Sequence, residues 1–269
     1  MKPVLVLDVV GTLLDLSALD PMFREHFGQA ELRKEWFSEV LKMVLTQTAI
    51  GKYEEFGRIT EAALEVIARR HEKDLNTASR KEILGQLRTL PAFPEVKPAL
   101  DHLHSQGFRL AALTNSGLTA AREALRNTGI AEVFERILSA DSAKRLKPAA
   151  APYRMAAQEL RVGTASMLMV AAHSWDLAGA AAAGCQTAFI QRPQQVLDLW
   201  RKTFAIWQKR SLHSKRHDSI RREAHYRATL HWRCCRADSA FSSTGQDSRY
   251  AHRSPLSRTP AFHSNGSHS

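Results

Sequence analysis

The sequence has little cysteine and no long apolar run, and both shortages narrow the class of protein. Cys185, Cys234 and Cys235 are the only cysteines in 269 residues. They are too few for a disulfide framework, and the adjacent pair lacks the spacing of a zinc or redox motif. The apolar start, Pro3 to Val10, is interrupted by Asp8 and resembles neither a signal peptide nor a membrane span. We therefore expect a soluble cytoplasmic protein with reduced thiols and no membrane partner.

Acidic residues are scarce only towards the C-terminus. The formal net charge is +11, which alone would suggest nucleic acid or an anionic surface as a partner. From Trp200 to Ser269 there are 14 Lys and Arg against 4 Asp and Glu, whereas Met1 to Leu199 has 24 against 23. The basicity thus belongs to residues 200–269, a Ser-, His- and Arg-rich tail that we predict to be disordered. Nucleic acid is not the expected partner of the nearly neutral body.

Within residues 1–199, strand patterns alternate with helix patterns. Apolar runs predict strands at 3–10, 108–113, 136–139, 167–172 and 186–190, and helical patterns predict helices at 96–106, 118–127, 151–160 and 177–183. Such alternation is typical of a parallel sheet that is covered on both faces. We predict an α/β fold with a Rossmann-like parallel sheet core, formed by residues 1–15 and 91–199.

Residues 16–90 lack strand-like runs. Helical periodicity recurs at 31–46 and 59–71, and three prolines between Pro91 and Pro98 mark the return to alternating strands and helices. We therefore predict an inserted helical cap domain over residues 16–90. In the core, ligands are expected beyond the carboxyl ends of the strands, and the polar motifs described next lie there.

The string LDVVGTLLD places Asp8 at the end of the first predicted strand, before Gly11 and Thr12. A carboxylate at this position can act as a nucleophile if N–H groups and a nearby cation keep it ionised. An aspartate that only caps a turn is the alternative. The string resembles the first motif, Asp-x-x-Gly-Thr, of the haloacid dehalogenase superfamily. The resemblance implies that Asp8 is the nucleophile and that Thr12 belongs to the substrate-binding residues.

Two further strings resemble motifs of the same superfamily in the same order. Thr114 and Asn115 match the second motif, which binds the anionic group of the substrate, although a helix N-cap is the alternative. Lys147, followed by proline, matches the third motif, a catalytic lysine that neutralises the nucleophile pocket, although a solvated lysine is the alternative. Tyr153 matches an active-site tyrosine of the dehalogenase branch, with core packing as the alternative.

The fourth motif separates the branches of the superfamily. In VAAHSWDLAGA, Asp176 is present, but Ala172 stands where the phosphatases of the superfamily have a second aspartate ligand for magnesium. Those phosphatases also have an acid two residues after the nucleophile, where this chain has Val10. Phosphoryl transfer would therefore lack its metal site and its general acid. We expect no metal and no cofactor.

The dehalogenase branch needs neither group, because halide leaves without a proton. Trp175 and Asp176 resemble the string of that branch, in which the aspartate orients or deprotonates the hydrolytic water; capping of the following helix is compatible with this role. That branch has serine and asparagine where this chain has Ala171 and His173. We place Trp175 and His173 among the substrate-binding residues and leave the specific role of His173 open.

The predicted insert supplies a candidate for halide binding. Arg33, in the string LRKEWF, resembles the halide-binding arginine of the dehalogenase branch. Arg24 and Arg58 are alternative ligands, and a solvated helix face would also explain a basic residue here.

The resemblance covers Met1 to about Pro193 and implies a metal-independent 2-haloacid dehalogenase of type II, similar to the L-2-haloacid dehalogenases. It would hydrolyse short 2-haloalkanoic acids to 2-hydroxy acids through an aspartyl ester. Two alternatives stay open: a phosphatase-like hydrolase of the same superfamily, and a non-enzymatic protein whose basic tail binds nucleic acid. A homodimer is compatible with the sequence.

The segment after Pro193 departs from the pattern of this fold, which continues with another strand and helix. We find no convincing counterpart of that strand; residues 194–208 have the composition of a helix, and a frameshifted or foreign C-terminus would explain the tail.

Overall fold

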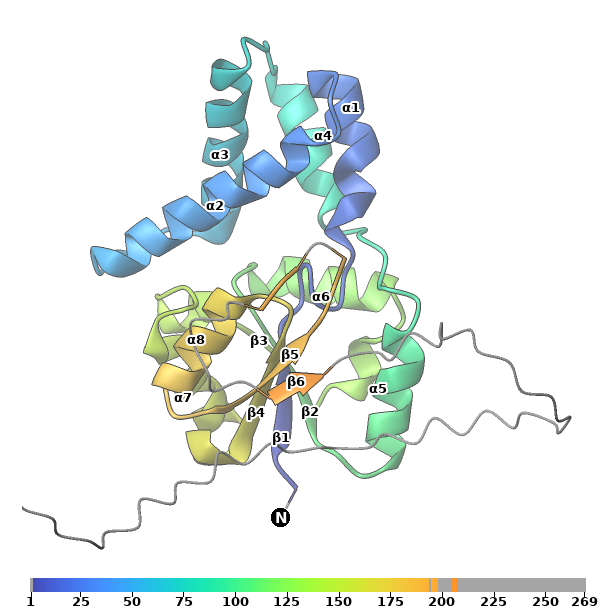
Figure 1. The fold of residues 1–269 in the computed structure, drawn as a ribbon, viewed down its shortest axis with the longest axis vertical. Helices are drawn as coiled ribbons and strands as arrows, with labels where there is room; N and C mark the ends of the chain where they lie inside the picture. The colour runs from blue at the N-terminus through green and yellow to red at the C-terminus, as the bar shows by residue number, and fades with distance from the viewer. Residues whose placement is uncertain (1, 194, 198–204, 208–269) are drawn as a thin grey trace, which may run out of the picture. The chain divides into compact units, whose positions relative to one another are not determined.

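A computed structural model describes residues 2–193, 195–197 and 205–207 of the chain (Figure 1). Its centre is a six-stranded sheet in the order β3-β2-β1-β4-β5-β6, in which all paired strands are parallel. The strands are β1 (Val4–Leu7), β2 (Leu110–Thr114), β3 (Arg136–Ser139), β4 (Met167–Ala171), β5 (Gln186–Ile190) and β6 (Ala205–Trp207). The predicted α/β class with a Rossmann-like parallel sheet is confirmed.

Helices cover both faces of this sheet, with α5 and α6 on one side and α7 and α8 on the other (Figure 1). Alternate residues of β1 explain the arrangement: Leu5 and Leu7 pack in a core cluster with α5 and α6, and Val4 and Val6 pack in a second cluster with α7 and α8. A strand that is buried on both faces is apolar at every position. These helices are α5 (Val96–Ser105), α6 (Leu118–Asn127), α7 (Ala150–Glu159) and α8 (Ser174–Ala182).

The predicted helical segment between β1 and α5 contains four α-helices. They are α1 (Asp20–Phe27), α2 (Leu32–Ala49), α3 (Phe56–Arg70) and α4 (Thr77–Gln86). Helices α2 and α3 correspond to the two expected periodic stretches. The sequence pattern missed α4 because Ile83 is its only buried residue, so it carries almost no apolar periodicity. It also missed α1, a short helix that buries Phe23 and Phe27 beside Trp36.

Short 3-10 helices connect several of these elements: η1 (Leu16–Leu19), η2 (Ala131–Val133), η3 (Ala140–Ala143) and η4 (Thr164–Ser166). One of them meets the helical segment, because the hydroxyl of Tyr53, between α2 and α3, donates to the carboxylate of Asp141 in η3. The ammonium of Lys144 binds the same carboxylate at 2.7 Å and lies 4.8 Å from the centre of the Tyr53 ring. Burial and the charge of Asp141 raise the pKa of Tyr53, so the phenol stays a donor.

The expectation of no strand after Pro193 is wrong. Ala205–Trp207 forms β6, which pairs in parallel with β5, where the sequence suggested a helix over 194–208 or the beginning of a disordered tail. A three-residue strand is too short to leave an alternating pattern in the sequence. The predicted disorder of the rest of the tail lies outside the described residues. Within the described part of the chain, no helix is long and apolar enough to cross a membrane.

Candidate active site

Asp8 follows β1 directly, at the carboxyl edge of the sheet, and its side chain accepts hydrogen bonds on both oxygens. The hydroxyl of Thr12 donates to Oδ2 at 2.6 Å, and Nζ of Lys147 donates to Oδ1 at 2.8 Å. Only 5% of the surface of Asp8 is exposed. The backbone N–H of Asp8 binds the carbonyl of Val170 in β4 at 3.0 Å. The strand end and three contacts therefore hold the carboxylate in one orientation.

Lys147 is 1% exposed, so the alternative of a solvated surface lysine is wrong. Its ammonium makes three hydrogen bonds, to Asp8 at 2.8 Å, to Oδ2 of Asp176 at 2.6 Å, and to the carbonyl of Leu113 at 2.8 Å. An ammonium has three hydrogens, and all are used here. Lys147 thus lies between two buried carboxylates that are far apart in the sequence.

The electrostatics of Asp8, Lys147 and Asp176 move the pKa values of the two carboxyl groups in opposite directions. Burial by itself would raise the pKa of Asp8, but Lys147, with contributions from His173 and the hydroxyl of Thr12, lowers it. Burial raises the pKa of Asp176 against the attraction of Lys147, and the charge of Asp8 adds to the rise. Burial would lower the pKa of Lys147, but the two carboxylates raise it. Asp8 is therefore the carboxylate that stays ionised most readily, and Asp176 is the better proton acceptor.

Asp176 lies in the first turn of α8 and is 0% exposed. Its Oδ1 accepts a hydrogen bond from the hydroxyl of Tyr153 at 2.6 Å. His173, and not Asp176, is the N-cap residue of α8, and the two carboxylate oxygens of Asp176 accept from Lys147 and Tyr153, so capping does not account for the residue. Burial and the charge of Asp176 raise the pKa of Tyr153 well above its usual value. Tyr153 therefore stays a donor to Asp176, although it also belongs to the part of α7 that is buried in the core against the sheet.

Thr114 and Asn115 lie at the end of β2, beside Lys147. The amide of Asn115 accepts from the backbone N–H of Lys147 at 2.7 Å and donates to the carbonyl of Lys147 at 3.2 Å. The hydroxyl of Thr114 accepts from the N–H of Ser116 at 3.1 Å. Neither residue is an N-cap, since Gly117 holds that position in α6. Asn115 positions the lysine, and its expected contact with a substrate would need the second hydrogen of its amide.

His173 lies near Oδ2 of Asp8, and Trp175 packs against His173. Nε2 of His173 donates to the carbonyl of Val10 at 3.1 Å and lies 3.8 Å from Oδ2 of Asp8. The imidazole stacks on Trp175 at 5.6 Å between ring centres. Gly11, with φ +77°, makes room for this ring, because a Cβ atom there would lie 2.8 Å from Nε2. His173 is thus a donor beside the turn that follows Asp8.

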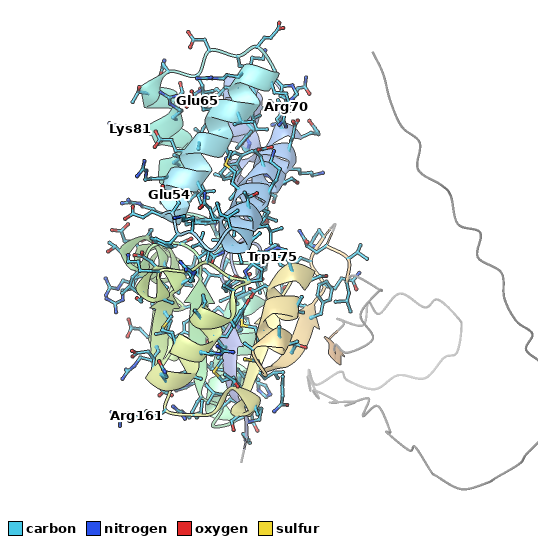
Figure 2. All side chains as sticks on the ribbon, turned by 90° about the vertical axis from the view of Figure 1, so that its left-hand side faces the viewer. Glu54, Glu65, Arg70, Lys81, Arg161 and Trp175 are labelled. Atoms are coloured by element: carbon cyan, nitrogen blue, oxygen red, sulfur yellow. The ribbon has the colours of Figure 1, made fainter. Side chains whose placement is uncertain are left out.

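A cleft of about 730 Å³ opens beside this turn, and its lining includes Gly11, Arg33, His173 and Trp175. Figure 2 shows Trp175 at the start of α8, at the level where the helical segment and the strands meet. The buried Nε1 of Trp175 has no hydrogen-bond partner among the described residues, so the indole is a spare donor.

Arg33 is the candidate for halide binding that the structure places in this cleft. Its guanidinium pairs with the carboxylate of Asp20, which also lines the cleft. Of the two alternatives, Arg24 is exposed, and Arg58 is an exposed partner of Glu54 at 3.5 Å. A halide at Arg33 would therefore have to share the guanidinium with Asp20.

The oxygen atoms around Asp8 do not fit a magnesium ion. Ala172 offers no side-chain oxygen, both oxygens of Asp176 accept from Lys147 and Tyr153, and the carbonyl of Val10 accepts from His173. In the described ranges, no three His, Cys, Asp or Glu side chains are grouped as a metal site would require. A magnesium ion needs several oxygens that are free to face it, and here ammonium, phenol and imidazole donors already bind them.

One residue of the site was missed by sequence reasoning. The guanidinium of Arg192, two residues after β5, donates to the carbonyl of Thr12 through Nε at 2.8 Å and Nη2 at 2.6 Å. A single arginine makes no motif. Its position, just after a strand and at the same edge of the sheet as Asp8, was the only available signal.

Comparisons with known proteins agree with this geometry. The family model of haloacid dehalogenase-like hydrolases matches residues 3–184. A haloacetate dehalogenase of Moraxella sp. (strain B) is 29% identical over 187 residues, which are 69% of this chain and 84% of that protein. An (S)-2-haloacid dehalogenase of Pseudomonas sp. (strain CBS-3) is 30% identical over 189 residues, 70% of this chain and 83% of that protein.

A solved structure agrees as well. The crystal structure of an L-2-haloacid dehalogenase aligns with a TM-score of 0.73 and 26% identity, and covers 77% of this chain and 94% of its own. The family model spans more than half of the sequence and includes the end of β1, the end of β2, Lys147 and the start of α8. The chain therefore belongs to the haloacid dehalogenase-like hydrolases.

Proposed function

We propose that this hydrolase is a metal-independent dehalogenase that converts short 2-haloalkanoic acids to 2-hydroxy acids. The observation that carries the proposal is the pairing of an ionised Asp8 with Lys147, beside an Asp176 whose two oxygens already accept from Lys147 and Tyr153. The similar haloacetate and (S)-2-haloacid dehalogenases support the same reaction.

In the first step, a lone pair of the Asp8 carboxylate forms a bond to the α-carbon of the substrate. The carbon–halogen bond breaks on the opposite side, and halide leaves with the bonding electrons. Lys147 keeps Asp8 ionised before this step and stabilises the ester oxygen after it. The leaving group needs no proton, so the reaction does not require a general acid at the position of Val10. The configuration of the α-carbon inverts.

In the second step, water adds to the ester carbonyl carbon of Asp8 and gives a proton to Asp176, whose pKa burial raises. The tetrahedral intermediate then breaks its bond to the alkyl oxygen, which takes that proton and leaves as the 2-hydroxy acid. Asp8 regains its carboxylate with one oxygen from water and releases one proton to solvent. Each turnover thus yields one halide and one proton.

Four of the other site residues bind the substrate or the departing halide in this scheme. Thr114 and the free amide hydrogen of Asn115 take the substrate carboxylate, Arg33 takes the departing halide, and Trp175 with its spare N–H lines the cleft. Tyr153 and Thr12 act through the two carboxylates. An apolar cavity of about 180 Å³, whose lining includes Val10, Phe37 and Ser116, would take the alkyl group.

The domain organisation belongs to the same proposal. Residues 16–90 act as a cap that excludes water, which would otherwise solvate and weaken the nucleophile. The core comprises residues 1–15 and 91–199, and the enzyme works in the cytoplasm.

A hydrolase of phosphate esters is the second candidate, since the fold is shared with phosphatases of the superfamily. It is disfavoured because Val10 cannot protonate a leaving oxygen and Ala172 cannot bind a metal. A chelator separates the two candidates, because it abolishes magnesium-dependent phosphatase activity and leaves metal-free dehalogenation unchanged.

The proposal is tested by following the transfer of oxygen from water to the carboxylate of Asp8. The protein is incubated with 2-chloropropionate and chloroacetate in ¹⁸O-water with a chelator, and chloride release and the mass of the peptide that contains Asp8 are measured. We expect chloride release and ¹⁸O in the Asp8 carboxylate, and neither in Asp8→Asn. Chloride release without label in the Asp8 peptide would reject the ester mechanism, and no chloride from the wild type would reject the proposed reaction.

A further inference from the structure

Arg192 holds the turn that follows the nucleophile. Its side chain is 7% exposed, and two of its nitrogens, Nε and Nη2, bind one acceptor, the carbonyl of Thr12. A buried carbonyl needs a donor, and a guanidinium offers two in a fixed geometry. This pair of donors, Nε and Nη2, forms a fork that fixes both the position and the direction of the Thr12 carbonyl.

The guanidinium is itself fixed from two other sides. Its Nη1 pairs with the carboxylate of Glu95, the N-cap residue of α5. Its central carbon lies 3.9 Å from the centre of the Phe93 ring. The backbone N–H of Phe93 also binds the carbonyl of Leu13, next to Thr12, at 3.0 Å. Residues 93–95 and Arg192 thus clamp the same short turn.

The position of this turn matters because the side chain of Thr12 contacts Asp8. Its hydroxyl donates to Oδ2 of Asp8 at 2.6 Å and accepts from the backbone N–H of Ala172 at 3.0 Å. The hydroxyl hydrogen is thus bound to Asp8, and a lone pair of the hydroxyl oxygen accepts from the residue that follows β4. This geometry holds only while the backbone of Thr12 stays in place.

We propose that Arg192 is a positioning residue for the nucleophile: it fixes the backbone of Thr12, so that the threonine hydroxyl holds Oδ2 and aims the Asp8 carboxylate. The inference rests on the proposed role of Asp8 as the nucleophile. A displacement of about 1 Å at a reacting group costs on the order of 100-fold in rate, so a group that never touches the substrate can matter this much. Lysine cannot replace the fork, because it has a single point of charge.

Arg109, an exposed arginine, supplies a control with the same kinds of contact. It also binds a glutamate and a carbonyl, with Nε and Nη2 on Glu135 at 2.7 Å and Nη2 on Leu160 at 2.8 Å. It directly precedes β2, so it lies at the opposite edge of the sheet from Asp8. Replacing it removes the same kind of contacts without touching the nucleophile turn.

In chloride release, we expect Arg192→Ala and Arg192→Lys to lower kcat by about 10- to 100-fold, with KM within about threefold of the wild type. Methylguanidinium should restore part of the kcat of Arg192→Ala. Arg109→Ala should keep the wild-type kcat and show no rescue. Unchanged kcat in a folded Arg192→Ala variant, or wild-type kcat in Arg192→Lys, would overturn the inference, since the latter would mean that only the charge matters.

A second readout needs no turnover and decides the matter even if no haloacid is a substrate. The ¹³C signal of the Asp8 carboxyl, assigned with Asp8→Asn, is titrated in each variant. The pKa of Asp8 should rise in Arg192→Lys, which keeps the charge, because the Thr12 hydroxyl bond that helps to lower this pKa weakens. It should stay at the wild-type value in Arg109→Ala. Equal values in the wild type and Arg192→Lys would reject the positioning role independently of the proposed reaction.

Discussion

Gly179 of α8 lies against Pro148 so closely that a Cβ atom on the glycine would be 2.4 Å from the carbonyl oxygen of Pro148. The contact joins the two segments that carry the buried ion pair. Lys147 directly precedes Pro148, and Asp176 lies about one helical turn before Gly179. The absence of a side chain at Gly179 lets α8 approach the lysine segment, and this approach allows Nζ of Lys147 to reach Asp176 at 2.6 Å.

Gly179→Ala should therefore damage both stability and activity. We expect a loss of about 1–3 kcal/mol in the free energy of unfolding, because the backbone of Pro148 cannot move aside, together with reduced chloride release. Gly85→Ala is the control, since Gly85 lies in α4 and a Cβ there meets nothing within 4 Å; it should gain about 0.5–1 kcal/mol. Urea unfolding measures both, and equal stability of the two variants would contradict the steric argument.

Lys147→Met should change the pH dependence of stability at this site, because the pKa of Asp8, which the lysine lowers, should rise as that of Asp176 already does. Without the ammonium, two buried carboxylates remain, so their pKa values in the folded state rise above the unfolded values. Groups with raised pKa values favour the folded protein when protonated, so the deficit should shrink as pH falls from about 8 to about 5.

At neutral pH we expect Lys147→Met to cost about 3–5 kcal/mol in urea unfolding. Lys144→Met is the control: Lys144 is an exposed partner of Asp141, and its loss should cost under about 1 kcal/mol. A deficit for Lys147→Met that stays constant across this pH range would show that the two carboxylates do not depend on the lysine.

Much of the core was predictable because burial leaves a strong pattern. The ranges of β3, β5 and α6 agree with the expected ones, since each is an apolar run or a periodic stretch bounded by turn residues. The four motif positions Asp8, Asn115, Lys147 and Asp176 also come together, because parallel strands bring their carboxyl ends to one edge of the sheet.

Other parts were not predictable, for physical reasons. Strand β6 has three residues and α4 buries only Ile83, so neither produces a period. The amide of Asn115 binds the backbone of Lys147, and no local pattern reports such a long-range contact. Arg192 binds a backbone carbonyl, an acceptor that every residue has, so the residue type of its partner does not indicate the interaction.

The thiol of Cys185 should be inert in the folded protein. Burial, together with the negative charge of Asp176, raises its pKa to about 11. At about pH 8 only about one thiol in a thousand would be the reactive thiolate. Mass spectrometry of the Cys185 peptide after iodoacetamide treatment should show little alkylation in the native protein and full alkylation in urea. Asp176→Asn should speed native alkylation; rapid labelling of the native wild type would contradict the burial of this thiol.

Restoring a single acid should not create a metal site. Ala172→Asp adds one carboxylate, but Lys147 still binds Asp8 and Asp176, and His173 still binds the carbonyl of Val10. We expect neither the wild type nor this variant to bind Mn²⁺ in titrations followed by electron paramagnetic resonance. Wild-type chloride release should be the same with and without chelator. Tight Mn²⁺ binding by Ala172→Asp would show that the donors around Asp8 rearrange readily.

Strand β1 pairs with β2 on one side and β4 on the other, and its side chains are buried in the core clusters on both faces of the sheet, so the backbone just before Asp8 is shielded from solvent. Amide protons of Val6 and Leu7 should then exchange with deuterium only when the whole domain unfolds. Local unfolding elsewhere in the chain would leave Asp8 in place. Thermal inactivation of this enzyme should consequently track global unfolding, without an earlier phase in which a folded protein has already lost its activity.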